Sequence, residues 1–542
     1  MLKKFHDLFG LRTDPIIFFV SAAIMIGFVF VAIAFTDTVD SVFETVKDWL
    51  LANLGWFYIL GVTSFLLFLI WIAVSRYGHV RLGGDEEQPE YNTATWFAML
   101  FAAGIGTILM FWGVAEPISH YANPPRADVE PQSIAAQEEA MAFTLYHFGL
   151  HTWTIFCLPA LAFAYFVYKR GLPMRVSSIF QPMLGEKIHG PIGKSIDILA
   201  VLGTLFGVAT SIGLGTLQIN AGLNSLFGIP QNKFVQVVLI TVITMIAIAS
   251  VVAGLDKGIK RLSNINITMA IGLLVFVFIA GSTLYLAKGI IETTGTYLKW
   301  IVPLAFWTDA ADVNPGWQGS WTVFYWAWTI TWAPFVGIFI ARISRGRTIR
   351  EFVGGVLGLP TAFTIIWFSV FGLSSFDIER NRDGNLVEEV VEQGDIPGAL
   401  FSFLENFPAT TFVAAISVLI VVIFFTTSSD SASLVVDMLC TGDVAAGPTR
   451  QRVFWAAAEG LIAATLLAAA AGTGGLDALQ QVITVVGLPF FLVGFFTMFN
   501  LVKALQEDHV ATGRPIRERK HARLRLQHRS SEEKRSEKPP AE

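Results

Sequence analysis

Long apolar runs separated by short polar loops dominate the chain. A helix that crosses a bilayer needs about 20 mostly apolar residues. Twelve runs meet that length, and their centres lie near Met25, Leu66, Leu109, Phe156, Gly207, Val242, Leu273, Ile330, Trp367, Leu419, Ala464 and Leu492. The pattern predicts an all-α polytopic membrane protein with twelve transmembrane helices. Two amphipathic stretches, 289–301 and 384–407, are expected to lie along the membrane surface.

The loops between these runs alternate in charge. Cytoplasmic loops of membrane proteins carry an excess of Lys and Arg. If the amino terminus is inside, the inside loops are the basic ones: they contain Arg76, Arg81, Lys169, Arg170, Arg175, Lys257, Lys260, Arg261, Arg342, Arg345, Arg347, Arg350, Arg450 and Arg452. The outside loops are richer in acids, namely Asp37, Asp40, Glu44, Glu388, Glu389, Glu392 and Asp395. This alternation predicts a multi-pass protein with both termini in the cytoplasm.

The composition agrees with a membrane protein. Of the 542 residues, 54% are hydrophobic and 15% are charged, whereas soluble proteins carry about 25% charged residues. The net charge of −5 indicates no particular partner, and nothing indicates a nucleic acid. Cys157 and Cys440 both lie in apolar runs, so no disulfide framework is expected. Residues 1–19 contain no small-residue cleavage site, which favours a retained first span.

Two spans stand out because polar residues, Gly or Pro interrupt them. The third contains "FAAGIGTILMFWG" and the eighth contains "WAWTITWAPFVG". Each begins a set of five spans, and because five is odd, the second set is inverted relative to the first. Interrupted segments at corresponding positions of two such halves indicate a transporter's binding site. In the alternative interpretation, Gly104 and Gly106 only allow close packing of helices.

This symmetry divides the chain into four parts. Residues 1–90 hold the amino terminus and two peripheral helices, and 91–290 form the first repeat. Residues 291–502 hold a surface helix and the second repeat. Residues 503–542 form a basic cytoplasmic tail.

Aromatic residues crowd the fourth and eighth spans: Phe148, Trp153 and Phe156 in one, and Trp321, Tyr325, Trp326, Trp328 and Trp332 in the other. Trp328 and Trp332 share a helix face because they are four residues apart. Indole faces attract a cation that has no hydrogen-bond donors, by about 2 kcal/mol or more when it is desolvated. An aromatic belt at the membrane interface is the alternative; it suits Trp317 and Trp321 but not Trp332, which lies well inside its span.

A dense run of hydroxyl side chains, "FFTTSSDSAS" at 424–433, lies in the tenth span. Oxygen ligands suit hard cations, so the run is a candidate Na⁺ site. A broken helix in the third span would supply backbone carbonyls, such as those of Ala102 and Ile105. Alternatively, any one hydroxyl could simply bond its own i−4 carbonyl.

Acids and histidines within the spans are candidate functional residues. Glu116 precedes Pro117, so a role in ending the span or in gating is expected at least as much as contact with the solute. Asp430 is expected to bond neighbouring hydroxyls and backbone. His147 and His151 are four residues apart, but the sequence shows no third ligand at metal-site spacing, and a metal site is not expected.

The two interrupted segments, extended to "FAAGIGTILMFWGVAEP" and "YWAWTITWAPFVGIFIARISRGRTIREF", together with "FFTTSSDSAS", resemble the betaine/choline/carnitine transporter family over about 14–502. The resemblance implies two peripheral helices and a 5+5 inverted-repeat core of the leucine-transporter type. It also implies a homotrimer in the lipid bilayer of the cell (inner) membrane. Family members carry quaternary ammonium compounds or compatible solutes, driven by Na⁺, by protons or by exchange.

The resemblance also implies roles for particular residues. The aromatic substrate region would contain Trp153, Trp328 and Trp332. One Na⁺ site would use the carbonyls of Ala102, Ile105 and Phe424 and the hydroxyls of Thr427 and Ser428, and a second would use Thr204 and Phe335. The unwound segment at Gly104 and Gly106 would offer backbone N–H groups to the solute's carboxylate or headgroup.

Departures from the family pattern leave the solute open. Ile108 replaces a third glycine, Phe148 a tryptophan, and Phe156 a tyrosine. Thr329 replaces a central tryptophan and adds a hydroxyl, and Val208 replaces a threonine of the second Na⁺ site. Glycine betaine, choline, carnitine, ectoine and dimethylsulfoniopropionate all remain candidates.

The sequence therefore predicts a secondary active importer of a small quaternary ammonium or zwitterionic solute that works in osmoregulation by alternating access. Na⁺ would be the coupling ion and not a prosthetic group, as the intact Thr427 and Ser428 favour. Proton coupling or exchange is the alternative. A channel would need a continuous polar pore, and a sensor would need a larger output domain than the tail provides. No nucleophile–base pair indicates an enzyme.

Overall fold

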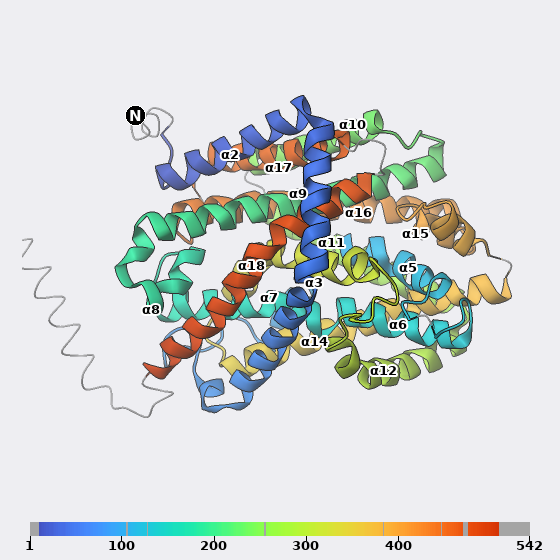
Figure 1. The fold of residues 1–542 in the computed structure, drawn as a ribbon, viewed down its shortest axis with the longest axis horizontal. Helices are drawn as coiled ribbons and strands as arrows, with labels where there is room; N and C mark the ends of the chain where they lie inside the picture. The colour runs from blue at the N-terminus through green and yellow to red at the C-terminus, as the bar shows by residue number, and fades with distance from the viewer. Residues whose placement is uncertain are drawn as a thin grey trace, which may run out of the picture.

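The computed structural model describes residues 10–104, 107–126, 128–253, 256–382, 384–445, 447–469 and 475–508, with backbone alone at 101–104, 107 and 256–260. These residues form helices and loops, and the single β-bridge among them joins Arg81 and Thr348 (Figure 1). The helices of the amino-terminal half are α2 (Pro15–Ala34), α3 (Thr36–Val74), η1 (Arg76–His79), α4 (Thr93–Gly104), α5 (Thr107–Ala122), α6 (Ile134–Phe148), α7 (Leu150–Phe163), η2 (Ala164–Lys169), η3 (Val176–Phe180), α8 (Gln181–Leu184), η4 (Gly185–His189), α9 (Pro191–Phe227), α10 (Lys233–Ala253) and α11 (Asp256–Ala280). The helices of the carboxyl-terminal half are α12 (Thr283–Ala305), η5 (Gly319–Val323), α13 (Phe324–Ile343), α14 (Ile349–Asn381), η6 (Glu388–Glu392), α15 (Ala399–Leu404), α16 (Thr410–Thr441), α17 (Thr449–Ala469) and α18 (Gly475–Gln506).

Eleven helices within the described ranges are long and apolar enough to cross a membrane. They coincide with eleven of the twelve predicted spans. The remaining predicted span, centred near Leu109, corresponds to two shorter helices, α4 and α5, on either side of 105–106. A polytopic membrane protein is therefore confirmed, while the twelfth span and the inverted repeat stay predictions.

Most of the long helices run roughly across the page in Figure 1, whereas α3 and α18 run obliquely to them. α3 contacts α7 and α18, and α2 contacts α9 and α17. Burial is highest in the continuous segment Ile134–Lys169, in α9 and in α13. These three segments make the interior of the bundle, whereas α2, α10 and α11 are much more exposed.

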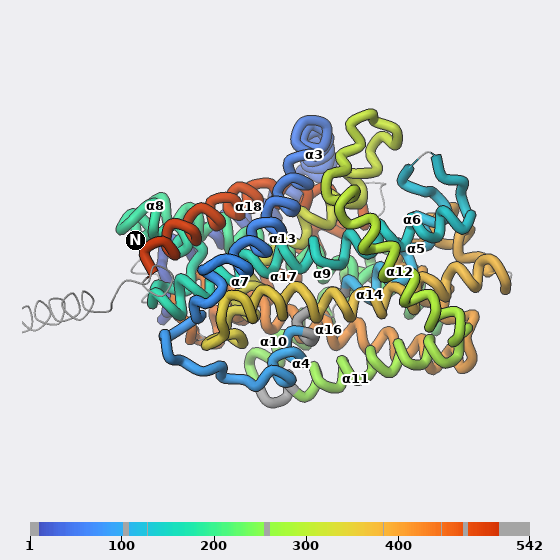
Figure 2. Tube along the Cα trace, turned by 90° about the horizontal axis from the view of Figure 1, so that it is seen from below, coloured from blue at the N-terminus to red at the C-terminus, as the bar shows by residue number. Residues whose placement is uncertain are grey.

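The division expected at residue 290 falls inside α12, which contacts α6 and α14 (Figure 2). Its buried residues, Leu286, Gly289, Thr293 and Tyr297, follow helical spacing, as expected of an amphipathic helix. The second predicted surface stretch, 384–407, instead divides into η6 and α15. α15 contacts α5 and is largely buried, so this part does not lie along a surface. α18 also continues past residue 502, to Gln506.

All described loops that the sequence places inside meet at one end of the bundle. Ion pairs join loops that are distant in sequence: Arg12–Asp443 at 3.0 Å, Lys194–Asp14 at 2.8 Å, Lys169–Asp85 at 2.7 Å, Arg170–Glu507 at 3.2 Å and Lys169–Asp508 at 3.8 Å. We call this end the basic face; it holds the start of α2, the loops around 75–92, 164–190, 344–348 and 441–448, and the end of α18. These contacts place the loops that the charges predict to be inside at the same end of the bundle. Their orientation in the membrane stays a prediction.

Glycines allow the interior helices to approach closely. A Cβ on Gly215 of α9 would lie 1.6 Å from the ring of Phe425 on α16, and one on Gly203 would lie 2.1 Å from Phe490 on α18. Close approach through small residues is a general route to helix packing in lipid. The glycines at these positions therefore allow α9 to pack closely against both α16 and α18.

A matched pair of substitutions tests this packing. Gly215→Ala is expected to lower the thermal unfolding midpoint of the detergent-solubilised protein, because overpacking costs about 1–3 kcal/mol. Gly354→Ala adds the same methyl group in α14 where no neighbour lies within 4 Å. It should leave the midpoint unchanged or raise it slightly. Equal midpoints for Gly215→Ala and the unmodified protein would contradict the close approach of α9 and α16.

Candidate functional site

The start of α5 is fixed by side chains from two other helices. Nε1 of Trp367 in α14 donates to the carbonyl of Leu109 at 3.0 Å, and Nε2 of Gln218 in α9 donates to the carbonyl of Met110 at 2.7 Å. Gly113 leaves room for the indole, since a Cβ there would lie 3.0 Å from its nitrogen. Neither donor was predictable from the sequence, because nothing local marks a polar residue that bonds a distant helix.

The predicted ligands in the third span lie at the junction of α4 and α5. Ile105 and Gly106 lie outside the described residues. Ala102 and Gly104 belong to α4, which ends at Gly104 among the described residues. α5 begins at Thr107. The predicted unwound stretch between them stays a prediction.

α9 and α13 approach each other directly beside the predicted aromatic site. A Cβ on Gly207 would lie 2.7 Å from Oγ1 of Thr331 and 3.2 Å from the backbone nitrogen of Trp332. α9 begins at the basic face and α13 ends there, so the two helices run in opposite directions. Thr204, one turn before Gly207, and Phe335, one turn after Trp332, therefore lie at similar depth. The hydroxyl of Thr204 donates to the carbonyl of Ala200 at 2.8 Å.

A row of aromatic rings joins α7 and α13. The ring centroids of Trp153 and Phe156 are 5.7 Å apart, those of Phe156 and Trp332 are 6.3 Å apart, and those of Trp332 and Phe335 are 5.3 Å apart. Nε1 of Trp332 has no hydrogen-bond partner among the described residues. The structure thus brings Trp153 and Phe156 of the fourth predicted span into one row with Trp332 of the eighth.

Two other predicted aromatic residues, Trp328 and Phe148, pack outside this row. Trp328 stacks on Phe324 with centroids 5.8 Å apart, and its Nε1 donates to Oγ of Ser211 at 3.1 Å. Phe148 stacks face to face with Phe368 of α14 at 4.7 Å. No ring contact in the described structure joins Trp328 or Phe148 to the row of Trp153, Phe156 and Trp332. Thr329 is buried one residue after Trp328.

Partial exposure follows one stripe of α13. Trp332, Phe335 and Phe339 are half-buried, whereas the residues between them are buried. Their spacing of three and four residues places them on one face, and this face leads from the middle of the helix to the basic face. α13 runs unbroken through Pro334, so the eighth span has no unwound stretch at its proline. Its irregular turn is η5, before Phe324.

The hydroxyl run lies on α16, with Thr427 and Ser428 half-buried and Phe424 buried. Oγ1 of Thr427 donates to the carbonyls of Ile423 and Phe424, at 2.9 and 3.1 Å. A hydroxyl that donates to backbone keeps its oxygen lone pairs free to accept or to coordinate. A hydroxyl of this run can therefore donate to a carbonyl of its own helix and still be a ligand of an ion.

The rest of the run faces α17. Oγ of Ser429 donates to Glu459 at 2.8 Å, and Arg452 pairs with Asp430 at 3.0 Å. Asp430 was expected to bond hydroxyls and backbone; its ion pair with an arginine from the next span was not foreseen. The fully buried Glu459 was also missed, although an acid inside an apolar run is a recognisable sign.

Glu116 lies in a second buried cluster. α5 continues through Pro117 to Ala122, so the expectation that Glu116 ends the span is wrong. Its Oε1 lies 2.6 Å from Nδ1 of His147 and 3.3 Å from Nε2 of His120. These atoms satisfy the spacing of a metal site, which corrects the expectation from His147 and His151 that no third ligand exists. The i, i+4 pair Glu116 and His120 was the overlooked signal.

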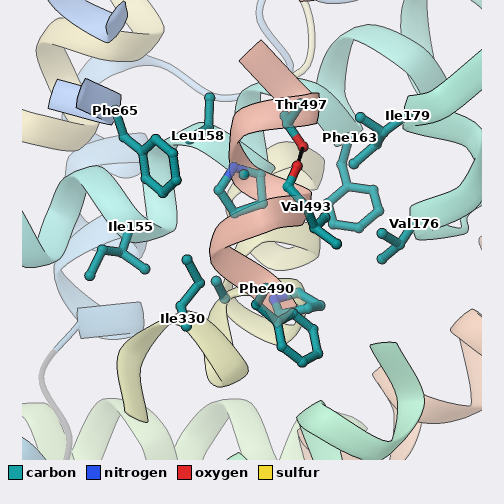
Figure 3. A pocket seen from close by; sticks show the side chains of 14 residues that line it. Phe65, Ile155, Leu158, Phe163, Val176, Ile179, Ile330, Phe490, Val493 and Thr497 are labelled. Carbon is teal, nitrogen blue, oxygen red and sulfur yellow. Dashed lines mark hydrogen bonds between the residues drawn. The ribbon is translucent and has the colours of Figure 1, made fainter. Parts of the chain in front are cut away.

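One cavity lies apart from these residues. It is about 40 Å³ in volume and is bounded by α3, α7, α13 and α18, with apolar walls that include Ile155, Leu158, Ile330 and Phe490 (Figure 3). An apolar cavity of about 150 Å³ is large enough for benzene, so this one is too small for a solute of several carbon atoms.

Comparison with known proteins agrees with this architecture. Residues 16–510 match the sequence model of the BCCT family, the betaine/carnitine/choline family transporters. Over 505 residues the chain is 51% identical to the ectoine/glycine betaine/proline transporter EctP of Corynebacterium glutamicum, covering 93% of this chain and 82% of that protein.

Two further relatives are similar along most of their length. A glycine betaine transporter of Acinetobacter baylyi is 42% identical over 495 residues, 91% of this chain and 74% of the relative. The high-affinity choline transport protein of Escherichia coli K12 is 39% identical over 527 residues, 97% of this chain and 77% of the relative. These relatives are named as transporters rather than enzymes, and the region matched by the family model includes all described helices except Pro15, the first residue of α2. The chain belongs to the betaine/carnitine/choline family of transporters.

Proposed function

We propose that this protein imports a small zwitterionic or quaternary ammonium solute by Na⁺-coupled alternating access. The observation that carries the proposal is the position of the aromatic row. Trp153, Phe156 and Trp332 lie between α7 and α13, and Trp332 is half-exposed in the middle of a buried helix. Indole faces in such a place attract a cationic nitrogen group.

The other end of a zwitterion would meet the start of α5. Free N–H groups at a helix amino terminus attract anions because the helix dipole is positive there. The bonds from Gln218 and Trp367 hold this helix start in place. A carboxylate at α5 and a cationic group at the aromatic row would suit ectoine, glycine betaine or proline. These are the solutes named for the Corynebacterium glutamicum relative.

Na⁺ coupling is supported by the oxygen donors on two helices. Thr427 and Ser428 are half-buried on α16, and their hydroxyl oxygens are hard ligands. An unwound stretch after α4 would add backbone carbonyls, including that of Ala102. Thr204 and Phe335, at similar depth on facing helices, are candidates for a second ion. Val208 offers no oxygen one turn from Thr204, so we propose coupling to one Na⁺ through the first site.

Alternating access is supported by the stripe of half-buried residues on α13. Trp332, Phe335 and Phe339 lead toward the basic face, which the loop charges predict to be cytoplasmic. In this conformation, a solute beside Trp332 would leave along this stripe. Homotrimers in the cell membrane, with both termini in the cytoplasm, complete the proposed arrangement.

Uptake into proteoliposomes tests the proposal. Radiolabelled ectoine, glycine betaine, proline and choline are offered separately with an inward Na⁺ gradient, an inward H⁺ gradient, or neither. We expect accumulation of at least one zwitterion only with the Na⁺ gradient. Accumulation driven by H⁺ alone, or by exchange with internal solute alone, would contradict the coupling. No uptake of any of the four would contradict the solute class.

The double variant Thr427→Ala, Ser428→Ala is expected to abolish Na⁺-dependent uptake, because it removes both hydroxyl ligands of the proposed ion site. Uptake is measured against Na⁺ concentration in proteoliposomes. Thr426→Ala is the matched control: it removes a hydroxyl that donates to the carbonyl of Val422 at 2.9 Å, on the buried face of α16. Unaltered Na⁺ activation in the double variant would remove the proposed site.

Trp332→Leu is expected to raise the apparent substrate constant about 10- to 30-fold. The loss of a desolvated cation–π contact costs about 2 kcal/mol, and each 1.4 kcal/mol is about tenfold. Kinetics of uptake at saturating Na⁺ measure the change. Trp49→Leu is the control, because Trp49 is exposed on the outer surface of α3. A substrate constant like that of the unmodified protein would place the solute elsewhere.

A further inference from the structure

A carboxylate and two imidazoles meet in the interior of the bundle, away from the residues that hold the proposed solute. Glu116 and His120 lie on one face of α5, four residues apart, and His147 approaches them from α6. Oε1 of Glu116 lies 2.6 Å from Nδ1 of His147 and 3.3 Å from Nε2 of His120. The three potential ligand atoms lie within 4.8 Å of one another, and all three residues are buried.

Several polar atoms of this cluster are left without regular partners. Within the described structure, Nδ1 of His120 and Oε2 of Glu116 make no hydrogen bond of ordinary geometry, although the Tyr325 hydroxyl lies near the carboxylate. No Lys or Arg of the described structure pairs with Glu116. Buried polar groups without partners are costly, so the cluster has the capacity to bind a further group.

The donor set selects the kind of group. Two imidazole nitrogens and one carboxylate oxygen suit Zn²⁺ and similar divalent metals, with three protein ligands and an open fourth position. Ca²⁺ and Mg²⁺ prefer sites made of oxygens alone. Tetrahedral bonds of about 2.0–2.1 Å separate ligand atoms by roughly 3.3 Å. The separation between Glu116 and His120 already matches; the pair of Glu116 and His147 is a hydrogen bond that would lose its proton and open by roughly 0.7 Å.

Neighbouring side chains orient and enclose these ligands. Nε2 of His147 lies 2.8 Å from Oγ1 of Thr322 in η5, the kind of outer contact that fixes the ring of a metal-binding histidine. The rings of Trp317 and Trp321 lie 5.1 and 4.5 Å from that of His120. Both tryptophans suited an interfacial belt by sequence, yet in the structure they pack on this cluster and shield it from water.

The cluster lies near the end of α5. α4 begins beside the basic face, so α5 ends at the opposite face, at Ala122. His120 is two residues from that end. The same helix begins at the proposed solute site. His147 immediately precedes Phe148, the last residue of α6. A metal here would join α5 to α6 and, through Thr322, to the turn that leads into α13.

We propose that Glu116, His120 and His147 form a binding site for Zn²⁺ or a chemically similar divalent metal, and that occupancy slows transport by fixing α5 against α6. The effect on transport rests on the proposed function, whereas metal binding does not. The site is reached from the face opposite the basic face. Binding displaces the proton held between Glu116 and His147, and that proton leaves to solvent.

The binding test uses the purified full-length protein and two metals. Equilibrium dialysis against Zn²⁺ is expected to give one more bound equivalent in the unmodified protein than in Glu116→Gln or His120→Asn. Co²⁺ should produce the visible absorption of a tetrahedral site in the unmodified protein only. His189→Ala removes an exposed histidine and should leave that equivalent in place. Thr322→Val is expected to weaken the affinity about 10- to 100-fold.

Equal metal content in the unmodified protein and in both ligand variants would overturn the proposal and leave the cluster as a hydrogen-bonded brace. A transport test then separates the two proposals. In proteoliposomes that accumulate solute, Zn²⁺ should inhibit uptake by the unmodified protein at concentrations at least about tenfold lower than in His120→Asn. Zn²⁺ binding in a protein that transports none of the four solutes would leave this site standing and end the proposed function. Binding with equal inhibition of both proteins would refute the effect on transport.

Discussion

The satisfaction of backbone hydrogen bonds within an apolar medium is the constraint on which this structure depends. No water reaches the interior of a bilayer, so every N–H and C=O group there needs a partner in the protein or in a ligand. Most of the chain meets this requirement with long helices. The third predicted span differs, because the structure describes it as two shorter helices, α4 and α5, on either side of 105–106. Other helices gather around the start of α5 and donate to its carbonyls.

The supports of the junction show how that gathering is achieved. Gln218 and Trp367 come from helices far apart in sequence and donate to consecutive carbonyls of α5. Gly113 admits the indole, and Gly207 lets α9 reach the backbone of Trp332. Small residues and long donors thus act together: the glycines bring the helices close, and the donors set the position of the helix end. The start of α5 and the row of Trp153, Phe156 and Trp332 are thus both held by contacts between helices.

Most of the fold was predictable from the sequence, because the need to pair backbone groups in an apolar medium selects long apolar helices. Apolar length identified eleven spans, and loop charge identified the loops that meet at the basic face through pairs such as Lys169 with Asp85. The site was only partly predictable. Trp153, Phe156 and Trp332 meet, whereas Trp328 turns to Ser211 and Phe148 stacks on Phe368. Helical spacing tells which residues share a face of one helix, but it does not tell which neighbouring helix that face meets.

The partners that buried acids find on other helices were missed for the same physical reason. Glu459 is bonded by Ser429, and Glu116 by His147. A carboxylate inside a membrane protein requires such partners, and only the packing of helices supplies them. Most ion pairs of the basic face are partly exposed and individually weak, whereas Lys169 and Asp508 form a buried pair. The buried cluster at Glu116 is enclosed by aromatic rings, where each electrostatic contact is stronger. It adds to the ion pairs of the opposite end, such as Arg126 with Glu139 and Arg382 with Asp377.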